Sequence, residues 1–215
     1  MAVIFPRWAN KVPLYLAVVG ALGGAFLVFA VWYWGSPNYT DVGYAPEQPV
    51  PFSHRLHAGE LAMDCRYCHN TVERAAYAAI PPTETCMNCH KSIAKESKKL
   101  AAVRKSYESG RPIAWVRVHL LPDYTYFNHS VHVAAGVGCV SCHGRIDQMN
   151  IVRQAKPLSM SWCLSCHRQP DAQLRPRDEV TNMSYDPKQA GYEPAKDPAR
   201  KRKVDPPIHC SGCHR

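Results

Sequence analysis

The sequence is poor in charged residues and in stretches without proline. Asp, Glu, Lys and Arg make up 20% of the 215 residues, and 18 prolines recur along the chain. Because proline disrupts helix interiors and central strands, long regular elements are not expected over most of the length. Charged side chains are absent from Val12 up to Asp41. This stretch is therefore where a long apolar helix can form.

No cysteine lies outside one recurring pattern. The ten cysteines form five Cys-x-x-Cys-His pentads, at Cys65–His69, Cys86–His90, Cys139–His143, Cys163–His167 and Cys210–His214. Two cysteines at this spacing can bond the two vinyl groups of one haem, and the following histidine is the proximal iron ligand. Disulfides do not require this spacing, and zinc would not need a histidine after every pair. The sequence therefore predicts five covalently attached c-type haems.

The pentads assign the attachment and proximal residues directly. The predicted thioether sites are Cys65, Cys68, Cys86, Cys89, Cys139, Cys142, Cys163, Cys166, Cys210 and Cys213. The predicted proximal ligands are His69, His90, His143, His167 and His214. Porphyrins are large, flat and apolar, so five of them would supply the core that an irregular polypeptide needs. No pentad replaces its histidine with lysine, the deviant site expected of a multihaem nitrite reductase.

A second repeat precedes the pentads. Phe52–His57 and Phe127–His132 both have the pattern Phe-x-His-x-x-His, and each is followed by two pentads at similar offsets. The pattern predicts a duplicated two-haem module followed by a fifth haem site. Histidines three residues apart in a short helix share a face and can reach two haems. The predicted sixth iron ligands are therefore His54, His57, His129 and His132.

His119 is the next candidate for a sixth ligand. His209 is disfavoured because it adjoins Cys210 and would have to reach across its own haem. Methionine can replace histidine on a haem iron, although it also packs well against porphyrins. The alternatives of this kind are Met149, Met160 and Met183. Because enough ligands exist to cap every iron, the sequence favours an electron carrier over a catalyst of bond chemistry.

The formal charge of +9 does not indicate nucleic-acid binding. Five haems would add ten propionates, which basic side chains compensate. The stretch Lys91–Tyr107 is lysine-rich and predicts the best helix after the apolar segment, ended by Gly110. This helix is either a solvated face or a docking site for an acidic redox protein or anionic lipid.

The segment Val12–Trp34 predicts a transmembrane helix. At ~1.5 Å per residue it is about 35 Å long, enough to cross a bilayer, and Trp32–Trp34 form an aromatic belt. A cleaved signal peptide would have a shorter apolar core and a small-x-small cleavage site. Arg7 and Lys11 precede the helix, which places the N-terminus in the cytoplasm. We expect a single-pass protein of the bacterial cytoplasmic membrane with its haem domain on the periplasmic side.

The organisation predicted from these features has six parts. They are a cytoplasmic N-terminus (1–11), a transmembrane helix (12–34), an extended linker (35–51), a first two-haem module with the basic helix (52–126), a second two-haem module (127–198) and a C-terminal segment with the fifth haem site (199–215). The expected fold is that of a class III-like multihaem cytochrome c, mostly irregular, with short α-helices packed around five haems and one transmembrane helix.

The chain resembles a known family at several points. The anchor, the two Phe-x-His-x-x-His segments, Trp115–Tyr124 and Leu158–Cys163 resemble the membrane-anchored pentahaem cytochrome subunit of alternative complex III, a bacterial quinol oxidoreductase. The resemblance implies three kinds of partner: an iron–sulfur subunit, integral-membrane quinol-binding subunits and a monohaem cytochrome. It also implies a periplasmic cytochrome or copper protein as electron acceptor. Two alternatives stay open: a stand-alone membrane-anchored quinol dehydrogenase, and a tethered electron-shuttle cytochrome.

Overall fold

A computed structural model describes residues 5–200 and 202–214. The chain divides into two units, Met1–Asp41 and Val42–Arg215. The ends of the predicted segments 1–11 and 199–215 that fall on residues 1–4, 201 and 215 lie outside the described residues.

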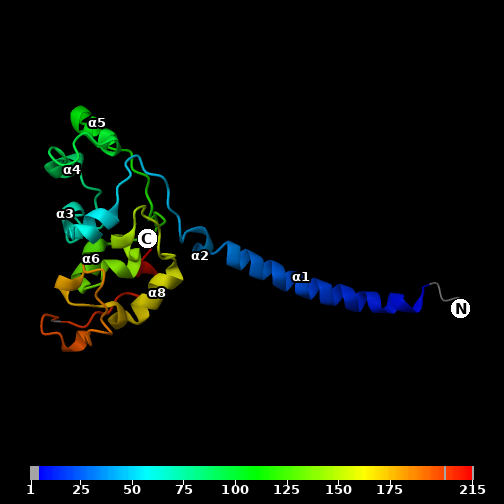
Figure 1. The fold of residues 1–215 in the computed structure, drawn as a ribbon. Helices are drawn as coiled ribbons and strands as arrows, with labels where there is room; N and C mark the ends of the chain where they lie inside the picture. Colours follow the sequence, from blue (N-terminus) through cyan, green and yellow to red (C-terminus); the bar gives the residue numbers. More distant parts are fainter. Residues whose placement is uncertain (1–4, 201, 215) are drawn as a thin grey trace. The chain divides into compact units, whose positions relative to one another are not determined.

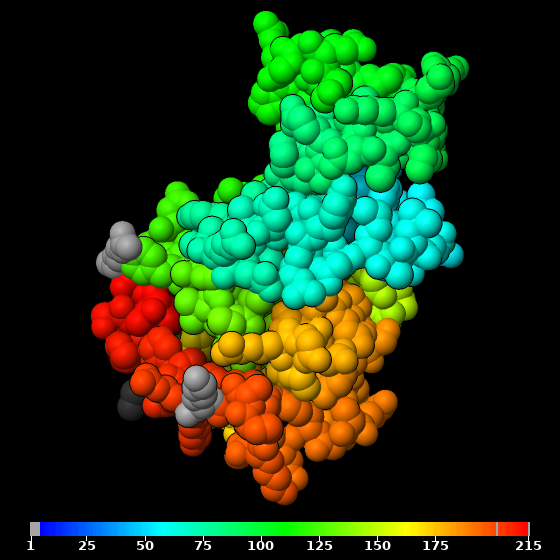
Figure 2. Space-filling model, turned by 90° about the vertical axis from the view of Figure 1, so that its left-hand side faces the viewer, coloured from blue at the N-terminus to red at the C-terminus, as the bar shows by residue number. Residues whose placement is uncertain are grey.

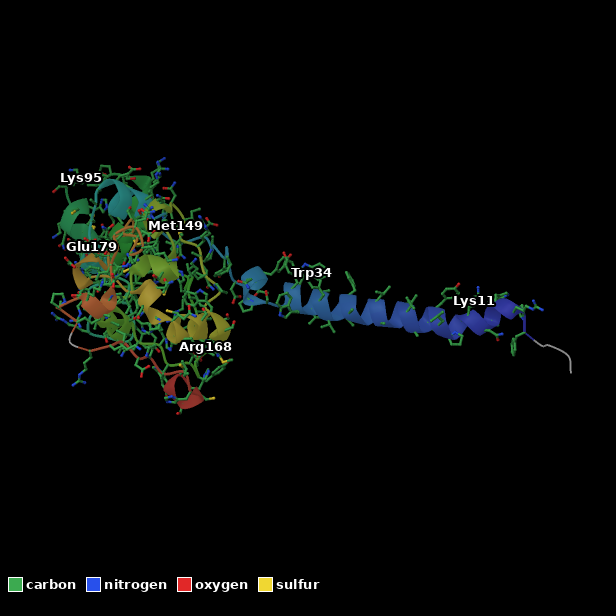
Figure 3. The ribbon with its side chains drawn as sticks, turned by 90° about the horizontal axis from the view of Figure 1, so that it is seen from below. Lys11, Trp34, Lys95, Met149, Arg168 and Glu179 are labelled. Atoms are coloured by element: carbon green, nitrogen blue, oxygen red, sulfur yellow. The ribbon has the colours of Figure 1, made fainter. Side chains whose placement is uncertain are left out.

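The first unit is dominated by helix α1, Val12–Trp34, which follows a short 3-10 helix at Arg7–Lys11. The predicted helix 12–34 is thus confirmed as a helix, and Lys11 and Trp34 mark its two ends (Figure 3). Nearly all of its apolar side chains are exposed. Among the described residues, Arg7–Trp34 is the one helix long and apolar enough to cross a membrane, with a mean hydropathy of 2.3.

The predicted linker 35–51 is not extended throughout, because a short helix α2 spans Pro37–Thr40. Pro37 suits the first turn of a helix, where its missing N–H is not needed. The N–H groups of Tyr39 and Thr40 both donate to the carbonyl of Ser36, which holds this turn. A one-turn helix of this kind depends on a few local contacts, which the composition of the segment does not reveal.

The second unit consists of short helices and loops (Figure 1). Its α-helices are α3 (Cys65–Cys68), α4 (Thr83–His90), α5 (Ala101–Ser109), α6 (His129–Ala135), α7 (Cys139–His143) and α8 (Met160–Arg168). A π-helix spans Arg55–Glu60, and 3-10 turns lie at Lys98–Leu100, Ile146–Gln148, Pro170–Gln173, Arg177–Glu179, Pro194–Lys196 and Cys210–Gly212. Extended pairing in the described part is limited to the isolated bridges Thr125–His214 and Val137–Leu174.

Few apolar side chains of this unit are buried by protein alone. One small cluster packs α4 on α5 through Val50, Met87 and Val103. Leu174 and Val180 are buried elsewhere, in a loop that closes against the third pentad through the Val180 carbonyl and the Cys139 N–H. So small a protein core agrees with the expectation that large apolar groups complete it.

The predicted helix Lys91–Tyr107 is wrong in its first half. The carbonyl of Cys89 accepts the N–H groups of both Ser92 and Ile93, so the chain turns after α4 instead of continuing. Ala94 has a positive φ of 51°, and α5 begins only at Ala101. The guanidinium of Arg104 donates to the carbonyls of residues 95 and 97, which holds the turn against α5. The predicted stop is correct, since Gly110 ends α5 in the left-handed conformation.

Candidate haem-binding site

The pentads occupy helical turns. Cys-x-x-Cys falls within α3, α4, α7 and α8, and in the fifth pentad the 3-10 turn Cys210–Gly212 ends directly before Cys213. Residues three apart on a helix point to the same side, so each pair of sulfurs faces one direction. Side chains cap two of these turns: Asp64 accepts from the Arg66 N–H and Ser159 from the Trp162 N–H. The local structure thus presents each cysteine pair and its histidine as one face.

Three pentad histidines lie opposite a histidine from a Phe-x-His-x-x-His segment. The ring centroids are 6.5 Å apart for His54 and His69, 6.3 Å for His57 and His90, and 6.2 Å for His132 and His167. An iron between two ring nitrogens, with metal–nitrogen bonds of about 2 Å on each side, would hold the centroids about 6 Å apart. These three pairs therefore fit a haem iron with two axial histidines.

Backbone carbonyls orient most of these imidazoles through Nδ1. Such a bond makes Nδ1 the protonated nitrogen and leaves the Nε2 lone pair for a metal, as is usual for ligating histidines. The distances from Nδ1 to the carbonyl oxygen are 2.9 Å (His57–Ser53), 2.9 Å (His69–Ala79), 3.0 Å (His90–Ile93), 2.8 Å (His129–Ala76), 2.8 Å (His132–Asn128), 2.7 Å (His167–Pro207) and 3.3 Å (His214–Tyr124). Every proximal histidine except His143 is thus oriented for iron ligation. The Nδ1 atoms of His143 and of His54 are buried without a partner among the described residues.

The phenylalanine of each repeat sets the angle of its two histidines. Phe52 stacks on His57 at 4.4 Å and meets His54 edge-on at 4.9 Å. Phe127 does the same to His132 and His129, at 4.6 and 4.7 Å. Because the same geometry occurs twice, the two segments are structurally equivalent as well as alike in sequence.

The third pentad, whose histidine is His143, has two candidate axial partners nearby, His119 and His129. The ring of His119 lies 4.5 Å from that of His143 at 81°, too close for an iron between them, and its Nε2 is buried without a partner among the described residues. Burial and the neighbouring His119 and His129 lower the pKa of His143 to about 3. Burial also lowers the pKa of His54 to about 4. Both imidazoles are therefore neutral near pH 7, the form that binds metal.

Among the described contacts no histidine ring faces His214. Its aromatic neighbour is Tyr124, with the two ring centroids 5.6 Å apart. Of the three methionine alternatives, Met149 and Met183 are buried and Met160 is 65% exposed. Met149 approaches Gly144, directly after His143. His209 folds back against Gly212 of its own pentad. The fifth site thus has a proximal histidine but no sixth ligand brought to it here.

Contacts between pentads give their order in space. Cys65 and Cys139 are hydrogen-bonded, which lowers the pKa of Cys65 to about 7 and raises that of Cys139. Burial raises the pKa of Cys68, Cys142 and Cys163. Neighbouring thiols raise these three pKa values further. The neighbour is Cys86 for Cys68 and Cys213 for Cys163, and Cys142 has two such neighbours, Cys166 and Cys163. The resulting order is second, first, third, fourth, fifth.

Backbone and side-chain contacts agree with this order at three places without reference to thiols. Asn88 beside the second pentad donates to Tyr67 of the first at 3.2 Å. The His129 N–H donates to Ala76, which joins the first pentad's loop to the second module. His167 donates to Pro207, just before the fifth pentad. This order was not predicted, because it depends on contacts between residues far apart in the chain.

One buried residue that the sequence did not single out is Arg175, which is 3% exposed. Its guanidinium lies against Gly138, where any Cβ would overlap it, and it donates to the carbonyl of Asn182 at 3.0 Å. Arg175 therefore fixes the loop that adjoins the third pentad. A single arginine in a loop gave no pattern from which this burial could be predicted.

Comparisons with known proteins agree with this geometry. Residues 36–111 match the class III cytochrome c family, and residues 125–215 match the family of cytochrome c7 and related cytochromes c. The chain is 30% identical, over 132 residues, to the multihaem cytochrome c subunit of a menaquinone reductase from Nitratidesulfovibrio vulgaris strain Hildenborough. The match covers 61% of this chain and 58% of that relative. The part of the chain after α1 thus has the predicted fold of an electron-transport multihaem cytochrome c of the class III and c7 types, with covalently bound c-type haem.

Proposed function

We propose that this chain is a membrane-anchored electron-transfer subunit that carries five c-type haems between a quinone-reacting membrane complex and a periplasmic electron carrier. The observation that carries the proposal is the set of three histidine pairs with centroids 6.2–6.5 Å apart. A bound haem supplies reversible one-electron Fe(III)/Fe(II) chemistry. The protein's part is to hold each iron between two neutral imidazoles and to keep the haems close together.

The assigned pairs leave the third and fifth pentads to be completed. We assign His129 to the third, because its Nδ1 is anchored at Ala76 and its position in the repeat matches that of His54. His119 is then the remaining histidine for the fifth iron, with methionine as the alternative. If His119 or a methionine completes the fifth site, no iron has an open coordination position for a substrate, which favours electron transfer over bond chemistry at the haems.

The membrane topology in this proposal follows from α1. Arg7 and Lys11 precede it and no basic residue follows closely, which favours an N-terminus in the cytoplasm and the haem unit in the periplasm. Partners of the alternative complex III type fit this arrangement: an iron–sulfur subunit, integral-membrane quinol-binding subunits and a monohaem cytochrome, with a periplasmic cytochrome or copper protein as acceptor.

A second candidate has the opposite direction of electron flow. The relative from Nitratidesulfovibrio vulgaris is the cytochrome subunit of a menaquinone reductase, so this chain would receive electrons from a periplasmic donor and deliver them to quinone. Residue placement at the haems is the same in both candidates, because reversible one-electron transfer has no preferred direction. We favour quinol oxidation on the wider resemblance along the chain.

The test is purification of the tagged chain from native membranes. We expect an intact mass above that of the apoprotein by about five haem masses, since five pentads use every cysteine, and copurification of large membrane subunits. Quinol should reduce the haems of the complex. A mass gain of four haems or fewer after proper maturation contradicts the relay. Isolation of the chain alone, still reducible by quinol, favours the stand-alone dehydrogenase, and haems that equilibrate only with a periplasmic donor favour quinone reduction.

A further inference from the structure

The second pentad lies at one end of the row, on a lobe made of α4, α5 and the turn between them (Figure 2). The contacts that tie it to another pentad run to the first: His90 faces His57, and Asn88 donates to Tyr67. Cys89 is exposed. A haem attached here would therefore be the terminal one, close to the surface and reachable from outside the protein.

This lobe carries a large excess of positive charge. Residues 91–111 contain seven lysines and arginines against two glutamates. The exposed cations are Lys91, Lys95, Lys98, Lys99, Lys105 and Arg111, and none of the ion pairs found in the described part of the chain involves them. Lys95 lies at the outer edge of the unit (Figure 3).

Haem propionates do not account for this excess. One haem brings two carboxylates, which together with the two glutamates still leaves three of the seven cations in excess. A surface of unpaired lysines raises the rate of encounter with an acidic partner, typically by ~10–10³-fold at low salt. The charge is therefore suited to steering a partner toward this end of the row.

An exposed apolar residue lies between two of these lysines in the chain. Ile93 is 63% exposed, and its carbonyl accepts the Nδ1–H of the proximal ligand His90 at 3.0 Å. A protein that covered Ile93 would thus contact a residue hydrogen-bonded to His90, the proximal ligand of this haem. Exposed apolar side chains together with charged ones are usual in protein interfaces.

We propose that an acidic one-electron carrier protein docks on this surface, the lysine lobe (Lys91, Ile93, Lys95, Lys98, Lys99 and Lys105), and exchanges an electron with the haem of the second pentad. The inference rests on the proposed electron-transfer function and names one site of exchange with a partner. When the carrier is the donor it loses one electron, and one iron goes from Fe(III) to Fe(II).

A lipid surface fits the lysine lobe less well. Membrane-surface helices bury a continuous apolar face in the lipid. The apolar side of α5 is already used, since Val103 is 2% exposed and packs with Met87 and Val50. Ile93 alone offers too little apolar area for insertion. Charge with one exposed apolar residue favours a protein partner.

The test uses the full haem-loaded chain in neutral detergent micelles and reduced flavodoxin, a small acidic flavoprotein, as donor. Stopped-flow absorbance at the haem bands measures the second-order rate of haem reduction at several salt concentrations. The variant combines Lys95→Glu, Lys98→Glu and Lys99→Glu. Glutamates at 98 and 99 suit the start of a helix, so folding should be unaffected. We expect a rate at least about tenfold lower at low salt, with most of the salt dependence lost.

The matched control reverses three exposed cations away from the lobe, Lys188→Glu, Arg202→Glu and Lys203→Glu, and changes the net charge equally. It should keep most of the rate. Equal rates for the lobe variant and the wild type, or an equal loss in the control, overturn the proposal. So does an effect seen only in phosphatidylglycerol nanodiscs, which would make the lobe a lipid-binding surface. Haem content and full reduction by dithionite, measured on every variant, report separately on the five-haem relay.

Discussion

Replacing His132 by alanine tests the axial assignment where the geometry is sharpest. Among the described ring contacts His132 faces one pentad histidine, His167, at 6.2 Å, and its Nδ1 donates to the carbonyl of Asn128 at 2.8 Å. If Nε2 of His132 binds the iron of the fourth haem, its removal leaves that iron five-coordinate and high-spin. One haem in five should change, and the reduced protein should bind about one carbon monoxide per chain.

The variant should remain folded, because the other losses are small. The substitution removes a hydrogen bond worth about 0.5–1.5 kcal/mol and the stack on Phe127, worth about 0.5–1.5 kcal/mol. Their sum of about 1–3 kcal/mol lies below the ~5–15 kcal/mol stability of typical domains. The high-spin signal can then be attributed to the missing ligand, and not to unfolding.

The assay combines absorption and electron paramagnetic resonance spectra with carbon monoxide titration. Added imidazole should restore the low-spin state of the variant, since it can occupy the freed position. His209→Ala is the matched control and should bind no carbon monoxide. A His132→Ala protein that stays fully low-spin and binds no carbon monoxide would refute the pairing with His167.

Two further predictions concern the helix and the first pentad. Gly20→Leu with Gly24→Leu should leave the protein inserted and haem-loaded but loosen it from its membrane partners, because helices associate in lipid through close packing at small residues. Within this chain a Cβ at either glycine meets nothing within 4 Å, so the substitution should not disturb the chain itself. Leu22→Ala is the control, and full copurification of the double variant with its partners would contradict the prediction. Asp64 has a pKa lowered to about 2, chiefly by its hydrogen bonds with Arg66, so its stabilising effect is present above about pH 4 and lost toward pH 2. Asp64→Asn should flatten this acid dependence of the unfolding midpoint, measured by circular dichroism, and an unchanged profile would contradict it.

The sequence predicted the chemistry of the site better than its arrangement. The pentads and the Phe-x-His-x-x-His repeats are local patterns, so Cys65–His69 or Phe52–His57 can be recognised without any fold. α1 is predictable for the same reason, since a long apolar run has one stable form in a membrane. The order of the pentads depends on contacts such as that between Ala76 and His129, and these are set by how separate loops pack.

The errors have local causes of a different kind. The helix expected at Lys91–Tyr107 fails because the Cys89 carbonyl accepts two N–H groups and turns the chain, an outcome that helix propensity does not anticipate. His119 stays a predicted axial ligand, and its spacing to His143 excludes only an iron between those two rings. Arg175 was missed because nothing in its neighbourhood distinguishes a buried arginine from an exposed one.

The placement of two ligands on one turn has a consequence for how this protein would fail. His54 and His57 leave the same turn toward different pentads. The proposed assignment of His129 to the third pentad gives it and His132 the same arrangement. Fraying of one turn would release the sixth ligands of two irons together, so ligation should be lost in pairs. Within a module, the distance between the two ligating histidines is fixed because they are only three positions apart in the chain. Between modules the haems are joined by weaker contacts, such as the hydrogen bond from the His129 N–H to the Ala76 carbonyl. The junction of the first and third pentads is therefore where the row of five would first divide into two and three.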